Sequence, residues 1–225
     1  MKRLIATAAL ATLVATPALA QSYPGVPDEG FYLGTAIGQA KLKNALDDYD
    51  NAGWNTDDKD TAFKLFAGYQ FNPNFAVEAS YVDFGKFSAN AITDYEEAYI
   101  VEIDDVASRT VREDDEISID GFGFALVGRL PIDAGFSVFG KLGLFAWDAS
   151  ANFSESTTYR VGNDSFTTSA SDSASVDNID PFYGIGAEYV ANQIMVRLEL
   201  ERYDLSDGDV KLKTDLLSAS IGYRF

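Results

Sequence analysis

The chain has 225 residues and carries 35 Asp and Glu side chains against 17 Lys and Arg, a formal net charge of −18. This acidity argues against a nucleic-acid partner, because phosphates are bound by Lys and Arg. The sequence contains no histidine, the commonest general base and metal ligand, and no cysteine, so disulfides contribute nothing to its stability.

The first thirty residues have the pattern of an export signal followed by an extended leader. Met1-Lys2-Arg3 is basic, Leu4 to Ala15 is apolar, and Ala18-Leu19-Ala20 is a small-x-small cleavage site. The apolar run is too short for an anchor helix, which needs about 20 residues. We therefore predict a cleaved signal peptide at residues 1–20 and a leader at 21–30. The mature chain then has 15 basic and 35 acidic side chains, a net charge of −20.

Alternation of apolar with small or polar residues dominates the rest of the chain. A period of two indicates β-strands with one apolar face. The last strand is the clearest example, since apolar residues stand at every second position from Leu217 to Phe225. In chain order the pattern predicts eight strands, at residues 31–42, 61–71, 75–85, 117–130, 136–148, 180–190, 193–203 and 211–225.

The connections between these strands alternate in length. Tight turns are predicted at residues 72–74, 131–135 and 191–192, whereas long polar loops are predicted at 43–60, 86–116 and 149–179. Short turns on one side and long loops on the other, with an even number of strands, are typical of bacterial outer-membrane barrels.

The position of the charges distinguishes a membrane barrel from a soluble one. In a soluble lipocalin-like barrel, Lys and Glu face outward and large apolar side chains face inward. Here the charged residues share a face with the glycines: Glu78, Arg129, Lys141, Glu188, Arg197 and Glu199. Charges on the apolar face stand near the long-loop ends of their strands, where they would reach the lipid headgroups: Asp83, Asp148, Arg202 and Asp215.

Residues 31–225 are therefore predicted to form one all-β domain. The domain is an eight-stranded antiparallel up-and-down transmembrane β-barrel with short periplasmic turns and long acidic extracellular loops. We expect a monomer in the outer membrane of a Gram-negative cell, surrounded by outer-membrane lipid and lipopolysaccharide. A soluble periplasmic lipocalin-like carrier is the alternative.

Several short motifs follow one another along the mature chain. They are Phe31-Tyr-Leu-Gly-Thr-Ala-Ile-Gly38, Phe75-Ala-Val-Glu-Ala-Ser-Tyr81 with Asp83-Phe84-Gly85, Lys141-Leu-Gly143, Tyr183-Gly-Ile-Gly-Ala187, and Ser218 to Phe225. In this order they resemble the small eight-stranded outer-membrane β-barrel family, which includes OmpA-like transmembrane domains and opacity-type porin-family proteins. The resemblance implies that the barrel-assembly machinery and periplasmic chaperones are partners during insertion.

The same family has a C-terminal assembly signal of the form polar, x, Gly, x, x, aromatic, x, aromatic. Ser218, Tyr223 and Phe225 match this signal, while Ser220 stands at the glycine position. Because serine is also small, the resemblance still implies recognition by the assembly machinery.

Four inward charges, Glu78, Lys141, Glu188 and Arg197, are expected at similar heights above the short turns. The interior of an eight-stranded barrel is just wide enough for side chains, so these charges should be paired. We expect the pairs Glu78–Arg197 and Lys141–Glu188. The set is either a structural plug that satisfies buried polar groups, which we favour, or a gate of exchangeable ion pairs.

Acidic residues cluster in the first two long connections: Asp47, Asp48, Asp50, Asp57, Asp58 and Asp60, then Glu102, Asp104, Asp105, Glu113, Asp114, Asp115 and Glu116. Such groups suit Ca²⁺ or Mg²⁺, but the spacing lacks a calcium-loop pattern and a solvated, repulsive surface is the simpler interpretation. We therefore assign no metal site and no cofactor.

Catalysis is not expected. Barrel-borne outer-membrane hydrolases such as lipid A deacylases, omptins and phospholipases use a histidine, and the carboxylates here have no supporting context. We predict a non-enzymatic integral outer-membrane protein with a structural or surface-interaction role through its acidic extracellular loops. A narrow porin-like channel for small solutes or ions is the alternative.

Overall fold

The computed structural model describes residues 29–43, 46, 49, 51–100, 105–133, 135–208 and 210–225. The predicted signal peptide and most of the predicted leader therefore lie outside the described residues. Within the described part of the chain, no helix is long and apolar enough to cross a membrane.

Nine antiparallel strands make up almost all of the described chain. They are β1 (Gly30–Lys43), β2 (Asn55–Asp57), β3 (Lys59–Asn72), β4 (Phe75–Ile100), β5 (Asp105–Asp133), β6 (Phe136–Val161), β7 (Asp164–Ala191), β8 (Ile194–Asp207) and β9 (Val210–Arg224). β1 pairs with β3 and with β9, and β4 pairs with β5, so eight strands close into a ring. The short β2 pairs with β4 beside this ring. The predicted eight-stranded antiparallel barrel is confirmed.

The two faces of the barrel wall differ as the alternation predicts. Outward side chains are apolar and exposed, for example Phe122 at 68% and Ile185 at 66%, whereas the inward Phe145 and Met195 are fully buried. A continuous apolar outer face is unfavourable in water and favourable in hydrocarbon. The outer face is therefore the lipid-facing surface.

The short turns have the local chemistry that their sequence predicts. The Asn72 side-chain oxygen accepts hydrogen bonds from the backbone N–H groups of Asn74 (2.9 Å) and Phe75 (3.0 Å). Asn192 has a positive φ of 57°, a conformation that asparagine tolerates better than most residues. At the same end, the Phe225 N–H donates to the Phe31 carbonyl (2.9 Å), which ties the last residue to β1.

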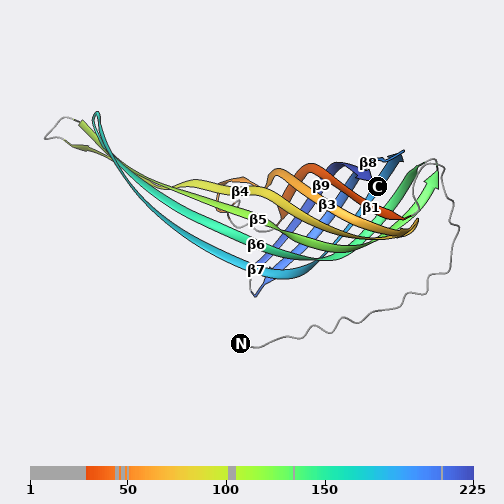
Figure 1. Ribbon diagram of the computed structural model, residues 1–225. Helices are drawn as coiled ribbons and strands as arrows, with labels where there is room; N and C mark the ends of the chain where they lie inside the picture. Colours follow the sequence, from red (N-terminus) through yellow and green to blue (C-terminus); the bar gives the residue numbers. More distant parts are fainter. Residues whose placement is uncertain are drawn as a thin grey trace.

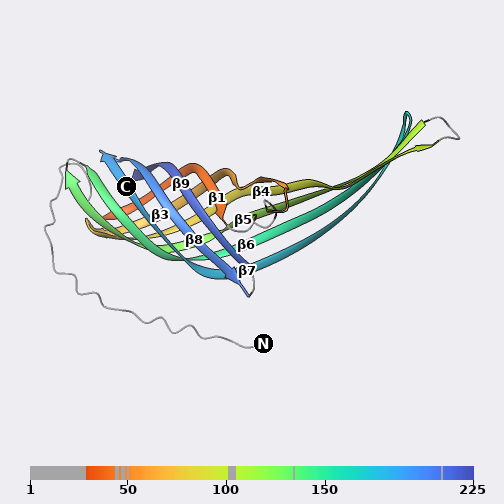
Figure 2. The same ribbon diagram turned by 180° about the vertical axis from the view of Figure 1, so that it is seen from behind.

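Two of the predicted loops are strands. Residues 86–100, 105–118, 150–161 and 164–175 continue β4, β5, β6 and β7 as a four-stranded antiparallel sheet, which we call the projecting sheet. Figure 1 shows this sheet curving away from the barrel, and the reverse view in Figure 2 shows the same arrangement. The prediction of loops at 86–116 and 149–179 is wrong for the described residues of these segments, apart from the turn at 162–163 that joins β6 to β7.

The projecting sheet has no apolar alternation because most of its side chains on both faces are at least partly exposed to solvent. Ser and Thr occupy much of its outer face, which continues the lipid-facing side of the wall. Backbone hydrogen bonding between long neighbouring strands, together with cross-strand side-chain pairs, replaces burial as the source of order. Thr158 and Thr167, for example, face each other in register and share a hydrogen bond of 3.0 Å.

Inside the barrel the side chains form layers. Near the short turns lies a small apolar cluster of Tyr32, Phe66, Ala76, Val127, Phe139, Val190 and Met195. Nearer the projecting sheet lies a larger cluster that includes Phe84, Phe145, Phe182 and Tyr203. Between and around these clusters the wall contributes buried charged side chains, which are the candidate site.

Candidate functional site

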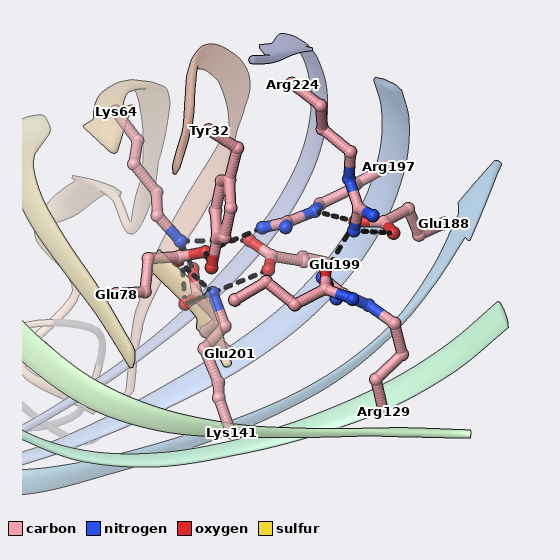
Figure 3. Close-up of polar contacts among 11 residues, drawn as sticks. Tyr32, Lys64, Glu78, Arg129, Lys141, Glu188, Arg197, Glu199, Glu201 and Arg224 are labelled. Atoms are coloured by element: carbon pink, nitrogen blue, oxygen red, sulfur yellow. Dashed lines mark hydrogen bonds and ion pairs between the residues drawn. The ribbon is translucent and has the colours of Figure 1, made fainter. Parts of the chain in front are cut away.

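The interior charged layer consists of nine buried side chains from seven strands: Lys64, Glu78, Arg129, Lys141, Glu188, Arg197, Glu199, Glu201 and Arg224. Each stands at an inward position of its strand, because alternate residues point to the same side of the wall. Five are cations and four are carboxylates, so the layer is close to electrical balance. Figure 3 shows their side chains converging inside the barrel.

Glu78 is the centre of one half of this layer. Its Oε1 lies 2.7 Å from Lys141 Nζ, and its Oε2 lies 2.7 Å from Arg197 Nη1. The Tyr32 hydroxyl donates a third hydrogen bond to the same carboxylate (3.1 Å). Two cations and a neutral donor therefore compensate the removal of this carboxylate from water.

Two lysines and two glutamates complete this half. Lys64 Nζ lies 2.9 Å from Glu199 and 2.7 Å from Glu201, while Lys141 Nζ lies 2.6 Å from Glu199 and 3.4 Å from Glu201. Each ammonium group is thus shared between neighbouring carboxylates, and no more than 2% of any of these four side chains is exposed. Such sharing cross-links β3, β6 and β8 across the barrel interior.

Glu188 is the centre of the other half. Arg197 Nε (2.6 Å), Arg129 Nη2 (3.2 Å) and Arg224 Nη2 (2.9 Å) surround its two oxygens. Arg129 also donates to the Gln70 side chain. Arg197 contacts both Glu78 and Glu188, so it joins the two halves into one network.

The rings of the lower apolar cluster lie against the Arg197 guanidinium. Its Cζ lies 4.9 Å from the Tyr32 ring centre, 5.0 Å from that of Phe66 and 5.2 Å from that of Phe139. A cation near ring faces gains electrostatic stabilisation that is larger where water is absent. These contacts hold the guanidinium in place as well as stabilising its charge.

Above the charged layer, aromatic rings fill the barrel. Phe182 and Tyr203 stack with centroids 4.9 Å apart and planes 5° from parallel. Phe84 and Phe145 each meet Tyr203 edge-on at 4.9 Å. A charged layer and an aromatic layer therefore follow one another along the barrel axis.

One of the two predicted ion pairs is present. Glu78 and Arg197 pair as predicted, but the prediction of a Lys141–Glu188 pair is wrong, because Lys141 contacts Glu78, Glu199 and Glu201 while Glu188 contacts three arginines. The reason is geometric, since the stagger between tilted strands decides which inward residues meet across a barrel. Sequence counting along single strands does not supply that stagger.

Several members of the layer are absent from the predicted set of four. The alternation places Lys64, Glu201 and Arg224 at inward positions of their strands, as the structure does, but it does not place them beside the four. Arg129 and Glu199 are recognised from the sequence as inward, but not as neighbours of the four.

The residues of the predicted assembly signal lie on β9 and just after it. Ser218 faces the interior and is 4% exposed, whereas Phe225 faces outward and is 60% exposed. The Tyr223 and Phe225 rings meet edge-on at 5.0 Å at the short-turn end. These two rings are therefore accessible from the lipid side.

The predicted acidic clusters are only partly covered by the structure. Asp47, Asp48, Asp50, Glu102 and Asp104 lie outside the described residues, as does the side chain of Asp105. Over the ranges that are described, no three acidic side chains converge as a metal site would require.

Comparison with known proteins identifies the family. Residues 6–225 match the family described as outer membrane protein β-barrel domain. No curated protein matches the chain. Among solved structures, Neisserial surface protein A is 12% identical, with a TM-score of 0.51 over 87% of this chain and 97% of that one.

Two further solved structures are similar over the same extent. The attachment invasion locus protein Ail of Yersinia pestis is 20% identical, with a TM-score of 0.48 over 87% of this chain and 99% of that one. OprG of Pseudomonas aeruginosa is 16% identical, with a TM-score of 0.42 over 88% and 96%. With its family match over nearly the whole sequence and its closed antiparallel barrel, the chain belongs to the outer-membrane β-barrel proteins and is a protein of the outer membrane.

Proposed function

We propose that this protein is a non-enzymatic outer-membrane barrel that presents its projecting sheet to the outside of the cell as a contact surface. One observation carries the proposal: the barrel interior is filled by side chains, while β4–β7 continue far beyond it with their side chains exposed.

Charge favours a basic partner for this surface. The four segments of the projecting sheet contain eleven acidic and four basic residues. Glu113 and Glu155 face each other in register on neighbouring strands. The next pair along, Asp114 and Ser154, adds one more negative charge. Like charges directly opposite one another destabilise a sheet slightly, and a cationic partner would relieve that repulsion.

A hollow of about 420 Å³ at the root of the sheet supports the same view. Its lining includes the aromatic residues Tyr49 and Phe153 together with the carboxylates of Glu113, Asp115, Glu155 and Asp172. Phe153 stands between Asp115 and Asp172 in register. Aromatic faces and carboxylates together suit an ammonium or guanidinium group.

Surface display is tested with single cysteines, because the native chain contains none. Ser169→Cys places a thiol on the projecting sheet, and Gln193→Cys is the matched control in the β7–β8 turn. We expect a membrane-impermeant maleimide added to intact cells to label the first variant, and to label the second only after the outer membrane is permeabilised. Labelling of the Gln193→Cys variant alone in intact cells would refute the proposed orientation.

The channel hypothesis is tested by conductance. We expect the refolded mature chain to show no stable large open state in a planar bilayer, because both the charged layer and the aromatic layer cross the barrel. If the ion pairs act as a gate, the Glu78→Gln/Arg197→Gln variant will conduct more than the native chain. Unchanged conductance in this variant would exclude a gate and leave a structural plug.

A further inference from the structure

The outward charges near the projecting-sheet end of the barrel are divided by sign. On β1, β3, β8 and β9 the outward positions hold six cations against two aspartates, Asp204 and Asp215. We call these cations the basic sector: Lys41, Lys43, Lys59, Arg202, Lys211 and Lys213. It is unusual in a chain with twice as many acidic as basic residues.

The other half of the barrel has the opposite charge at this level. Asp83, Asp120, Asp148 and Asp177 are successive register partners across β4, β5, β6 and β7, and all four face outward. Four neighbouring carboxylates repel an anionic lipid headgroup. The basic sector is thus the half of the rim that anionic lipids would occupy.

The basic sector lies at the level of the lipid headgroups. Arg202 is eight residues from Ile194 at the short turn, which is about 26 Å along the strand and about 20 Å along the membrane normal for a strand tilted by about 40°. The apolar band of such barrels is about 25 Å tall. The backbone of Arg202 therefore stands within about 5 Å of the outer boundary of this band, directly above the lipid-facing Leu200. Its long side chain can reach the headgroups.

Three members of the basic sector share carboxylates but keep free donors. Arg202 makes two contacts with Asp215 (2.6 and 2.9 Å), Lys43 Nζ lies 2.5 Å from the same carboxylate, and Lys41 Nζ lies 3.1 Å from Asp58. Their side chains are 37–44% exposed. A guanidinium has five N–H donors and an ammonium three, so each can bind a further anion.

The other three members are exposed lysines. Across the described ranges, Lys59, Lys211 and Lys213 have no ion pair. Register places Lys59 opposite Lys41, and Lys213 opposite Lys43. The cations therefore stand in neighbouring positions on adjacent strands, close enough for one phosphate group to contact more than one of them.

A hollow in the lipid-facing wall begins beneath Arg202. It has a volume of about 230 Å³ and is lined by Tyr183, Gly184, Ile185, Leu200, Arg202 and Asp215, and by Glu201, which is itself almost fully buried. The side chains of Ile185 and Leu200 are apolar and face lipid. An apolar recess next to a cationic rim matches a molecule with an acyl chain below an anionic headgroup.

We propose that the basic sector and this hollow form a binding site for a phosphorylated glycolipid of the outer leaflet. Lys43, Arg202 and their neighbours bind its phosphate groups, and one acyl chain lies in the hollow against Ile185 and Leu200. The site rests on the proposed orientation, with the projecting sheet outside the cell, but not on any partner of that sheet. The cysteine-labelling test of orientation and the binding test below can therefore fail separately.

The test compares refolded mature proteins in detergent, with lipid A as the probe and native mass spectrometry as the readout. We expect Lys43→Gln/Arg202→Gln to weaken lipid A binding at least tenfold. The matched control, Arg112→Gln/Arg160→Gln, removes two exposed cations from the outer face of the projecting sheet and should change binding less than twofold. Equal losses in both variants would overturn the site, because they would reflect overall charge alone.

Three further binding measurements determine which parts of lipid A the site recognises. Lipid A without its phosphates should bind the native chain and the Lys43→Gln/Arg202→Gln variant equally weakly. Inorganic phosphate at millimolar concentration should compete poorly, whereas effective competition would indicate a free-phosphate site. Leu200→Trp, which fills the hollow, should reduce binding of lipid A more than binding of its deacylated headgroup.

Folding is controlled by the difference in gel migration between unheated and heated samples. If Lys43→Gln/Arg202→Gln fails to fold, Lys59→Gln/Lys211→Gln/Lys213→Gln removes only exposed lysines and should still lower the affinity for lipid A severalfold. Native affinity in that folded triple variant would contradict the proposal.

Discussion

Arg197 connects the charged layer to the apolar cluster near the short turns. It contacts the two carboxylates at the centres of the charged layer and lies against three aromatic rings, with about 1% of its side chain exposed. Its removal takes one cation from Glu78, which keeps Lys141, and one from Glu188, which keeps Arg129 and Arg224. The two halves of the layer then lose the side chain that joins them. Uncompensated buried charge is among the most destabilising changes a protein can undergo.

We therefore predict that Arg197→Met lowers the free energy of unfolding by about 3–5 kcal/mol. Urea titration of the refolded barrel in detergent, followed by heat-modifiable gel migration, measures the change. Arg160→Met, on the exposed projecting sheet, is the control and should cost less than about 1 kcal/mol. Adding Glu188→Gln to Arg197→Met should lower the stability further, because Arg129 and Arg224 then lose the carboxylate that they share. A recovery of stability in that double variant would contradict this account.

At the scale of elements, β9 serves two purposes. It closes the barrel against β1 and β8, and it ends in two outward aromatic rings. Phe225 is exposed to lipid, and its contribution to packing in the finished barrel is small compared with that of a buried ring. A residue that contributes little to the folded state can still be important if another protein recognises it during assembly.

We predict that deletion of Phe225 reduces the amount of folded protein in the outer membrane severalfold, while it lowers the stability of barrel that has been refolded in detergent by less than about 1 kcal/mol. Fractionated cells and urea titration provide the two measurements. Phe31→Ala, an exposed ring beside the same end of the barrel, is the control for simple loss of an aromatic contact. Equal effects in both assays would mean that Phe225 is only a packing residue.

The sequence was sufficient to predict elements in which one face is apolar, and insufficient elsewhere. The barrel strands carry an apolar residue at every second position, so their number, order and facing could be predicted. In the projecting sheet both faces meet solvent, and a run such as Ser169-Ala-Ser-Asp-Ser-Ala-Ser175 contains no signal that separates a strand from a loop. Long-range backbone pairing decides its structure, and single-sequence patterning does not encode it.

The sequence predicts which charged side chains of the candidate site face inward, but not which of them contact one another. Alternation identifies which charges face inward, but the stagger of the barrel decides that Lys141 meets Glu199 and Glu201 while Glu188 meets Arg129 and Arg224. The division of outward charges into a basic sector and a row of aspartates likewise emerges only when register aligns residues that are far apart in the chain.

At the scale of the whole molecule, closure depends on close approach between strands. A Cβ atom on Gly38 of β1 would lie 2.3 Å from the Leu217 carbonyl oxygen and 2.8 Å from the Ser218 Cβ of β9. The first of these neighbours is backbone, so a side chain at this position forces the two strands apart. A Cβ on Gly128, which is 4.0 Å from its nearest neighbour, meets no such obstacle.

We predict that Gly38→Ala destabilises the closed barrel by about 1–3 kcal/mol, and that Gly128→Ala changes its stability by less than about 0.5 kcal/mol. The urea midpoint for loss of the fast-migrating form on unheated gels gives both values. A Gly38→Ala protein as stable as the native one would show that the β1–β9 seam adapts to a larger residue.

That seam joins the first strand of the barrel to the last one, across the 166 residues of intervening chain from 44 to 209. All the other pairs in the ring join strands that follow one another along the chain, with only the short β2 between β1 and β3. Such local pairs close short loops. Before β1 and β9 pair, the strands form an open sheet with two edge strands, whose outer backbone N–H and C=O groups have no partner. Until these two strands pair, the polypeptide differs from the finished barrel by having a free strand edge at each side. A cellular factor that binds exposed strand edges would therefore distinguish the unfinished barrel from the finished one without recognising any particular side chain.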